Sequence, residues 1–548
     1  MNTRKRYHIK AVKISLLSVF ILCFGSCTKD FDELNTPKNL ITEKNISLAT
    51  LGQSFAYAQY YGFIGDQGGW ELMHELHASI YAQVFATTSA GFNTDQFQEV
   101  ASWVQAGFNS FYSEPAVMTN FVMKFTEEHN MPTENALAKL WQVPIWGRMT
   151  DFFGPVMFSQ FGNGKTSVEY DKQEDVYHSF FQILDESIAV LKQHTSETPF
   201  GKNDLIYEGN VNKWIAFANS LRLRLALRIV YADPVLAKQQ AEKAVADGVI
   251  LDNSGGANMK TSINSLNYLT RWTYINPFCM SATSESLLLG FEDPRLTVFW
   301  NEGGGRLGGN KGYHGVRNGL PVFLKTSELR SGAAGCSFPS KKFLPIADGG
   351  ENPPIPIITA SEVYFLRAEG ALRGWNMGGT AKELYNEGIR QSLKYWTGLS
   401  DSEIEDYVTS TKQPAPVADG IVGKDFNTPP VSDITVAYDE GGNFERQLEQ
   451  IITQKWIDLF MSPWECWAER RRTGYPRGYA IIESLDPDIP VTSIIRRMVF
   501  PPSEYTNNKQ GVENAVNLLG GPDKTMTRVW WDKKPLSDYP DLSSTIVH

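Results

Sequence analysis

The stretch HELH, from His74 to His77, places two histidines three residues apart on an expected helix. Side chains at this spacing share one helical face, so the two imidazoles could hold a metal ion together. Zinc protease helices instead use His-Glu-x-x-His, a spacing that HELH lacks. We therefore favour solvated or capped histidines, and we expect neither a metal site nor a cofactor.

Four arginines are concentrated in the segment AERRRTGYPRG, at positions 470–472 and at Arg477. Such a cluster is able to bind phosphate or nucleic acid. Against this, Glu465 and Glu469 lie one helical turn away, and the whole chain carries a formal charge of -10. Since nucleic acid favours basic surfaces, we expect these arginines to form structural ion pairs and expect no nucleic-acid partner.

The sequence patterns that usually mark a catalytic site are incomplete in this chain. The glycine-rich stretch at residues 301–315, NEGGGRLGGNKGYHG, lacks the Gly-Lys-Ser/Thr ending of a phosphate-binding loop and indicates an ordinary loop. Carboxylates are numerous enough for a glycosidase pair, but no local pattern singles out an acid and its partner. No Gly-x-Ser-x-Gly elbow marks a serine nucleophile. Binding without turnover is favoured, and a surface glycoside hydrolase remains as the weaker alternative.

Aromatic residues make up 12% of the chain, enough to supply both a core and exposed rings. Sugar rings present faces of C–H groups that stack on aromatic rings, while amides and acids bind their hydroxyls. Trp214, Trp456 and Trp467 lie on helical stripes and are expected in the core. The aromatic residues in loop-like stretches are either further core or ligand contacts. As candidate ligand contacts we take Trp70, Phe92, Trp272, Tyr274, Trp300 and Tyr313.

The amino end has the pattern of an export signal. A basic stretch without acids, MNTRKRYHIKAVK, precedes an apolar segment from Ile14 to Phe24 that is shorter than the roughly 20 residues of a membrane span. Gly25 and Ser26 stand directly before Cys27, as in bacterial lipoprotein signals. We expect residues 1–26 to be removed and Cys27 to carry the lipid, with an ordinary secreted protein as the alternative.

The remaining chain shows no Pro/Ser-rich linker that would divide it. We expect a lipidated cysteine and polar tether at residues 27–45, followed by a single composite domain at 46–548. Helical periodicity dominates this domain, interrupted by stretches rich in Gly, Asn and Pro. The helical scaffold is placed mainly at 46–250 and 356–475, and the loop-rich insertions at about 251–355 and 410–443.

Several segments repeat apolar residues at three- and four-residue spacing. In NVNKWIAFANSLRLRLALRIV, three arginines interrupt an otherwise apolar helix, so we expect them to be buried and paired. Pro234 should open the next helix and Gly248 should end it. Two further helix pairs are expected, at residues 132–154 with 172–194 and at 359–375 with 379–396. These pairs indicate a mainly α fold with helical hairpins like tetratricopeptide units, long inserted loops and little β structure. A non-repeating helical domain is the alternative that periodicity leaves open.

Blocks of sequence in a fixed order carry a resemblance to a known family. They are TDFFGPVMFSQ with YDKQEDVY, then DLIYEGNVNKWIAFANSLRLRLALRI, DPRL with YHGVRNG, PIITASEVYFLRAEGALRGW, and LEQIITQKWIDLF with WECWAERRRTGYP. The ending GGPDKTMTRVWWDKK fits as well. Together with the lipoprotein signal, this ordered set resembles the SusD/RagB family of outer-membrane nutrient-binding lipoproteins over nearly the whole mature chain.

The resemblance implies a lipid-anchored receptor on the surface of a Gram-negative outer membrane, with a tetratricopeptide-like helical scaffold. It also implies a partner TonB-dependent (SusC-like) transporter, for which the receptor captures an oligosaccharide or, in some branches, a peptide. The family carries over no catalytic residues. Because binding groups tend to lie on loops of a rigid scaffold, we expect the ligand mainly at residues 262–315, with Trp70 and Phe92 contributing.

Overall fold

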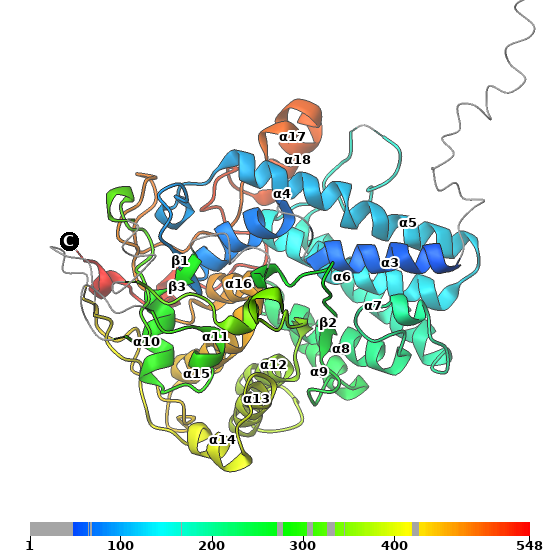
Figure 1. Cartoon of the computed structure of the whole chain (residues 1–548). Helices are drawn as coiled ribbons and strands as arrows, with labels where there is room; N and C mark the ends of the chain where they lie inside the picture. The colour runs from blue at the N-terminus through cyan, green and yellow to red at the C-terminus, as the bar shows by residue number, and fades with distance from the viewer. Residues whose placement is uncertain are drawn as a thin grey trace, which may run out of the picture. The chain divides into compact units, whose positions relative to one another are not determined.

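The structure is a computed structural model of the chain. It describes residues 48–63, 65, 68–165, 167–270, 278–303, 311–325, 335–344, 346–418 and 427–547. The chain divides into two compact units, Met1–Leu51 and Gly52–His548. Helix α3 (Leu48–Phe63) begins in the first unit, and all later elements belong to the second. The described residues are mainly helical, as the periodicity predicted, and their strands are short (Figure 1).

Helices fill the amino-terminal half and return after residue 356. The first group is α3 (Leu48–Phe63), the π-helix η2 (Gly68–Ser79), α4 (Ala101–Ser113), α5 (Pro115–Glu128), α6 (Pro132–Phe153), α7 (Gln173–Gln193), α8 (Val211–Arg228) and α9 (Pro234–Asp247). The later group is α12 (Ala360–Leu372), α13 (Ala381–Trp396), α14 (Asp401–Val408), α15 (Phe444–Asp458), α16 (Pro463–Thr473), α17 (Pro502–Asn507) and α18 (Lys509–Leu519). None of the helices in the described residues combines the length and apolar character that a bilayer crossing requires.

The predicted helix pairs are present: α6 packs on α7, α8 on α9, and α12 on α13. The limits of α9 follow from its sequence. The Asp233 carboxylate accepts a hydrogen bond from the Leu236 backbone N–H at 2.9 Å, and Pro234 occupies the first helical position. Gly248 follows the last residue with a φ of 99°, a conformation that suits glycine.

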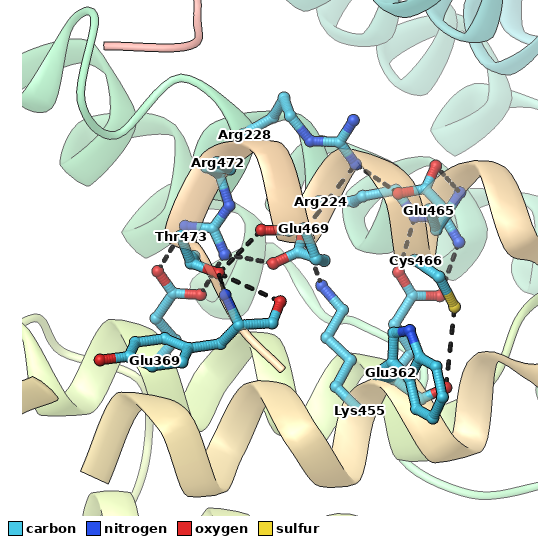
Figure 2. Close-up of polar contacts among 12 residues, drawn as sticks. Arg224, Arg228, Glu362, Glu369, Lys455, Glu465, Cys466, Glu469, Arg472 and Thr473 are labelled. Atoms are coloured by element: carbon cyan, nitrogen blue, oxygen red, sulfur yellow. Dashed lines mark hydrogen bonds and ion pairs between the residues drawn. The ribbon is translucent and has the colours of Figure 1, made fainter. Parts of the chain in front are cut away.

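A network of buried charges joins α8, α12, α15 and α16 (Figure 2). Its members are Arg224 and Arg228 of α8, Glu362 and Glu369 of α12, Lys455 of α15, and Glu465, Glu469 and Arg472 of α16. Arg224 lies 2.6 Å from Glu362, and Arg472 lies 2.6 Å from Glu369. The expected pairing of the α8 arginines is confirmed. Because each charge needs a partner from another helix, the network fixes how these helices pack.

Two short antiparallel ladders connect the long insertion to the scaffold. Strand β2 (Ala257–Met259) pairs with β4 (Ile355–Ile358), so the stretch 251–355 begins and ends at one place beside α8 and α12. Arg224 fixes this ladder by donating to the Ile357 carbonyl at 2.6 Å. Strand β1 (Phe85–Thr87) pairs with β3 (Phe278–Met280), which brings the insertion against the chain that follows η2.

The insertion is less loop-like than the sequence indicated. It contains α10 (Ala282–Gly290) and α11 (Leu296–Phe299), and most of α10 is buried. The Ser281 hydroxyl caps α10 by accepting from the Ser284 backbone N–H at 3.0 Å. This helix is short and buried on most sides, so it lacks the one-sided apolar pattern by which longer helices are recognised.

Candidate ligand-binding site

The structure describes the side chains of only three of the six aromatic residues expected at the ligand. Trp272 and Tyr274 lie outside the described residues. The backbone of Trp70 lies in η2, but its side chain also falls outside the described part of the chain. Phe92, Trp300 and Tyr313 have described side chains.

Trp300 belongs to the core. Its side chain is 1% exposed, and its ring lies 5.2 Å from the ring of Phe85 and 5.4 Å from that of Phe460. A ligand has no free face of this ring to stack on. We therefore move Trp300 from the ligand set to the core; its place beside the glycine-rich stretch suggested exposure, but the short helix α11 directs it inward.

Phe92 and Tyr313 remain partly exposed. The Phe92 ring stacks on Phe278, with centroids 5.6 Å apart and planes 19° from parallel, and it meets Trp103 edge-on at 5.8 Å. Partial burial, with Glu302 nearby, raises the pKa of the Tyr313 hydroxyl. Phe323 is a further aromatic that the sequence reasoning missed, and its side chain is 70% exposed.

Several described segments of the insertion are joined to one another and to the chain that follows η2. The Phe278 ring stacks on Phe92, Lys325 pairs with Asp95, and the backbone N–H of Gly303 donates to the Gly312 carbonyl at 2.7 Å. We call these segments the loop base, made up of Phe92, Asp95, Phe278, Gly303, Gly312, Tyr313, Phe323 and Lys325. A Cβ on Gly303 would lie 2.3 Å from the Gly335 carbonyl oxygen, and only glycine fits this approach.

A small apolar cluster supports the loop base from below. It contains Ala86 of β1, Cys279 of β3, Val316, Leu320 and Cys336. Met280 donates its backbone N–H to the Ser337 carbonyl, and Val316 donates to the Met280 carbonyl, both at 2.8 Å. Apolar packing and backbone hydrogen bonds of this cluster therefore hold the loop base in position.

A buried ion pair ties the Phe92 loop to the segment before residue 326. Lys325 Nζ lies 2.7 Å from Asp95 Oδ1 and donates to the Phe92 carbonyl at 3.0 Å. The side chains of Lys325 and Asp95 are 0% and 1% exposed. Burial raises the pKa of the Asp95 carboxyl, and the Lys325 ammonium opposes that shift. Lys325 thus joins the Phe92 loop to the segment before residue 326 through one ion pair and one hydrogen bond.

A cleft of about 620 Å³ is lined in part by residues that follow the Phe92 loop in the sequence. Its walls are residues 97–99, 485–489 and 523–526, which are distant in sequence. Asp95 lies in the 3₁₀ turn η3 (Thr94–Gln96), and this turn leads from the Phe92 loop directly into the cleft residues 97–99. Its volume lies within the range of small-ligand sites.

The model of the SusD-like family, described as "Susd and RagB outer membrane lipoprotein", matches residues 33–532. This chain belongs to the SusD/RagB family. A chitin-binding SusD homologue from Flavobacterium johnsoniae is 33% identical, with a TM-score of 0.79 over 88% of this chain and 99% of the other.

Solved SusD homologues from two further species are similar to the chain at nearly the same level. One from Bacteroides thetaiotaomicron is 31% identical with a TM-score of 0.78, over 88% of this chain and 99% of its own. Another, from Bacteroides uniformis, is 31% identical with a TM-score of 0.77, over 89% and 99%. No curated protein matches. The family membership agrees with the helical hairpin fold described above.

In this SusD-like chain, His74 and His77 are core residues. Their side chains are 4% and 0% exposed, so of the two expected environments, solvated or capped, the solvated one is wrong. His77 Nδ1 contacts the Leu72 carbonyl, and burial lowers the pKa of the His77 imidazole to about 4. In the described residues, no group of three or more His, Cys, Asp and Glu is placed to hold a metal ion.

The arginine cluster of the SusD-like chain is also structural. Arg472 pairs with Glu369 and Glu469, and Arg477 lies 2.9 Å from Glu449. The other two arginines differ from the expectation of ion pairs. Arg470 donates to the Tyr81 carbonyl, and Arg471 donates to two backbone carbonyls while stacking over Trp467 at 3.8 Å. Positions 470–472 are at most 3% exposed and do not form a surface for phosphate.

Proposed function

We propose that this chain is a surface receptor that binds an oligosaccharide and delivers it to a TonB-dependent transporter in the outer membrane. The observation that carries the proposal is its similarity, at 33% identity over 88% of the chain, to a chitin-binding SusD homologue. Membership of a family of outer-membrane lipoproteins supports the surface location, with Cys27 as the lipid attachment residue. Cys27 lies outside the described residues.

The loop base supplies the chemistry that such a receptor needs. Phe323 and the partly exposed Phe92 and Tyr313 offer aromatic surface for the C–H faces of sugar rings. The supporting ladder and the Asp95–Lys325 pair hold these residues in place before a ligand arrives, which lowers the entropy cost of binding. We place the ligand over the loop base, with Trp70, Trp272 and Tyr274 as further proposed contacts.

The test uses the purified chain from residue 28 onward, without its lipid, titrated with a panel of oligosaccharides and peptides by calorimetry. We expect saturable binding of at least one oligosaccharide class, chitin oligomers first, with no change in the sugar's chain length afterwards. Saturable binding of peptides alone would make the chain a peptide receptor. Turnover that survives repurification and ends with one carboxylate substitution would make it a glycoside hydrolase. An absence of all binding, with the transporter complex intact, would leave a structural lid.

A further inference from the structure

Hydrogen bonds hold the walls of the cleft, at residues 97–99, 485–489 and 523–526, in place. Leu485 donates its backbone N–H to the Gln96 carbonyl at 2.8 Å, and Gln96 Nε2 donates to Glu483 Oε2 at 2.9 Å. On the opposite wall, the backbone N–H groups of Arg496 and Arg497 donate to the Thr525 carbonyl at 2.9 and 3.1 Å. Both walls are therefore fixed by hydrogen bonds that leave the space between them open.

The lining of the cleft combines an apolar surface with carboxylates. Phe97 and Ile489 are buried at its base, and Leu485 is 41% exposed at its edge. Phe97 adopts a left-handed φ of 60°, held by a hydrogen bond from its own N–H to the Thr94 carbonyl at 3.0 Å. Such a surface accepts the C–H groups of a sugar ring, and the polar groups around it determine which sugar.

The charges of the cleft are predominantly negative. Glu99, Asp486, Asp488 and Asp523 line it together with a single cationic residue, Lys524. Asp523 is neutralised from behind, because it pairs with Arg497 and accepts from the Tyr505 hydroxyl at 2.8 Å. Lys524 lies 3.6 Å from Asp488 at the exposed edge. Among the residues that the structure describes, no cationic side chain lies at ion-pair distance from Glu99 or Asp486.

Glu99 is the carboxylate whose environment most favours a cationic ligand. Burial raises the pKa of the Glu99 carboxyl to about 7, with a further contribution from Asp523, while the Val499 backbone N–H and the Arg497 guanidinium lower it. Its Oε2 accepts from the Val499 N–H at 3.2 Å. A cation next to a partly desolvated carboxylate gains more than it would in water, because the local dielectric is lower.

We propose that this cleft binds the protonated amine of an amino sugar, such as an unacetylated glucosamine unit within the bound oligosaccharide. The inference rests on the proposed glycan-binding function and names the sugar class that this part of the site selects. Continuity supports it, since Asp95 of the loop base lies in η3, which runs directly into the cleft residues 97–99. One oligosaccharide is then expected to stack at the loop base and to place a charged unit in the cleft.

The direct test observes the cleft itself with the protein labelled by ¹³C at its methionine methyl groups. Met526 lines the cleft, and its signal is assigned with Met526→Leu. We expect glucosamine to shift the Met526 signal at concentrations where glucose and N-acetylglucosamine do not. A Met526 signal that glucosamine leaves in place, or that all three sugars shift equally, would overturn the proposal.

A second measurement separates the cleft from the loop base. Hexamers of β-1,4-linked glucosamine and of N-acetylglucosamine have the same backbone and differ in the charge of the nitrogen. Glu99→Gln and Asp486→Asn should each weaken binding of the glucosamine hexamer roughly threefold to tenfold and leave binding of the acetylated hexamer unchanged. Phe323→Ala should weaken both. Glu128→Gln removes an exposed carboxylate of α5 outside the cleft and should change neither.

The outcomes distinguish the two proposals. Equal affinity of the parent and both cleft variants for the glucosamine hexamer rejects the cleft assignment while the glycan receptor stands. A glucosamine-specific shift of Met526 without hexamer binding supports the cleft and counts against the loop base. Asp486 is partly exposed, so Asp486→Asn keeps the test decisive if Glu99→Gln fails to fold.

Discussion

Phe323 is the residue at which stacking is most simply tested. Its side chain is 70% exposed, so Phe323→Ala removes an aromatic face without opening a cavity. By analogy with base stacking on aromatic side chains, the loss should weaken glycan binding by about 1–3 kcal/mol. Calorimetry measures the affinity, and thermal unfolding should show an unchanged midpoint. Phe444→Ala on α15 is the matched control, and an equal loss of affinity in both variants would reject a specific contact.

Trp300 should behave in the opposite way. Because its ring is enclosed by Phe85 and Phe460, Trp300→Ala creates a core cavity and should lower the free energy of unfolding by about 3–5 kcal/mol. Denaturant titration measures this change. A variant as stable as the parent, with weakened glycan binding, would return Trp300 to the ligand set.

The difference between these two residues marks a limit of sequence reasoning at this scale. Trp214 and Trp467 lie on regular apolar stripes, and both are 0% exposed as predicted. Trp300 and Phe323 lie in irregular stretches, where no period tells an inward from an outward side chain. Only the hydrogen bonds of the neighbouring segments decide which of them faces solvent.

Among the elements, the Asp95–Lys325 pair determines how the Phe92 loop is held. Lys325→Met removes the ammonium and leaves the Asp95 carboxylate buried without its partner. This should lower the free energy of unfolding by about 3–5 kcal/mol at pH 8. With the pKa of Asp95 already raised by burial, protonation should relieve much of this cost at pH 5. Thermal unfolding at both pH values is the measurement.

The double variant Asp95→Asn with Lys325→Met supplies the control for that experiment. It removes both charges, so its stability should exceed that of Lys325→Met at pH 8 and should depend less on pH. If Lys325→Met loses the same stability at pH 5 and pH 8, the buried charge of Asp95 is not the cause.

The ion-pair network makes a comparable prediction for the helical scaffold. Burial alone would raise the pKa of Glu469, but Arg472, Lys455 and Arg228 outweigh it and hold that pKa well below the ordinary value of 4.5. Glu469 therefore stabilises the fold fully above about pH 4.5, and its contribution disappears as the pH falls through the lowered pKa.

Glu469→Gln should accordingly lower the free energy of unfolding by about 3–5 kcal/mol at pH 7 and by less in acid. Denaturant titration at pH 7 and pH 3 measures both values. The exposed pair of Lys382 and Glu440 is the control, and Glu440→Gln should change the free energy of unfolding by less than about 1 kcal/mol. Equal effects of the two substitutions would contradict a special role for the buried network.

Helical elements were the most predictable part of the fold. The stripe of α8 and the cap and stop of α9 are local features, and local features are visible in a sequence. The cleft was not predictable, because residues 97–99, 485–489 and 523–526 meet only through tertiary hydrogen bonds. The range expected at the ligand, 262–315, contains Phe278, Gly303, Gly312 and Tyr313 of the loop base. The Asp95–Lys325 pair lies outside that range and joins positions 230 apart, which no local pattern indicates.

For the whole molecule, the prediction concerns attachment to the membrane. Cys27→Ala removes the proposed lipid attachment residue, so the protein should move from the membrane fraction to the soluble fraction or remain unprocessed. Fractionation and surface labelling of intact cells measure this. Normal membrane fractionation and surface labelling of the variant would contradict a lipid anchor at this cysteine.

Association with the transporter is tested at the same scale by co-purification from membranes in mild detergent. We expect a TonB-dependent barrel to accompany the parent protein. Recovery of the receptor only as a free monomer in several detergents would count against a stable complex. If the transporter co-purifies with the parent protein but not with Cys27→Ala, the lipid anchor is required for the complex to assemble.

The backbone bond between Gly303 and Gly312 has an evolutionary consequence. The hydrogen bond joins Gly303 to Gly312 at one point, and the bridge of Trp300 with Pro339 joins two further points of the insertion. We expect insertions, deletions and substitutions between such joined points to leave the helical scaffold folded. Evolution would then change ligand specificity by exchanging short segments, and a laboratory library randomised over 304–310 should retain a high proportion of folded clones.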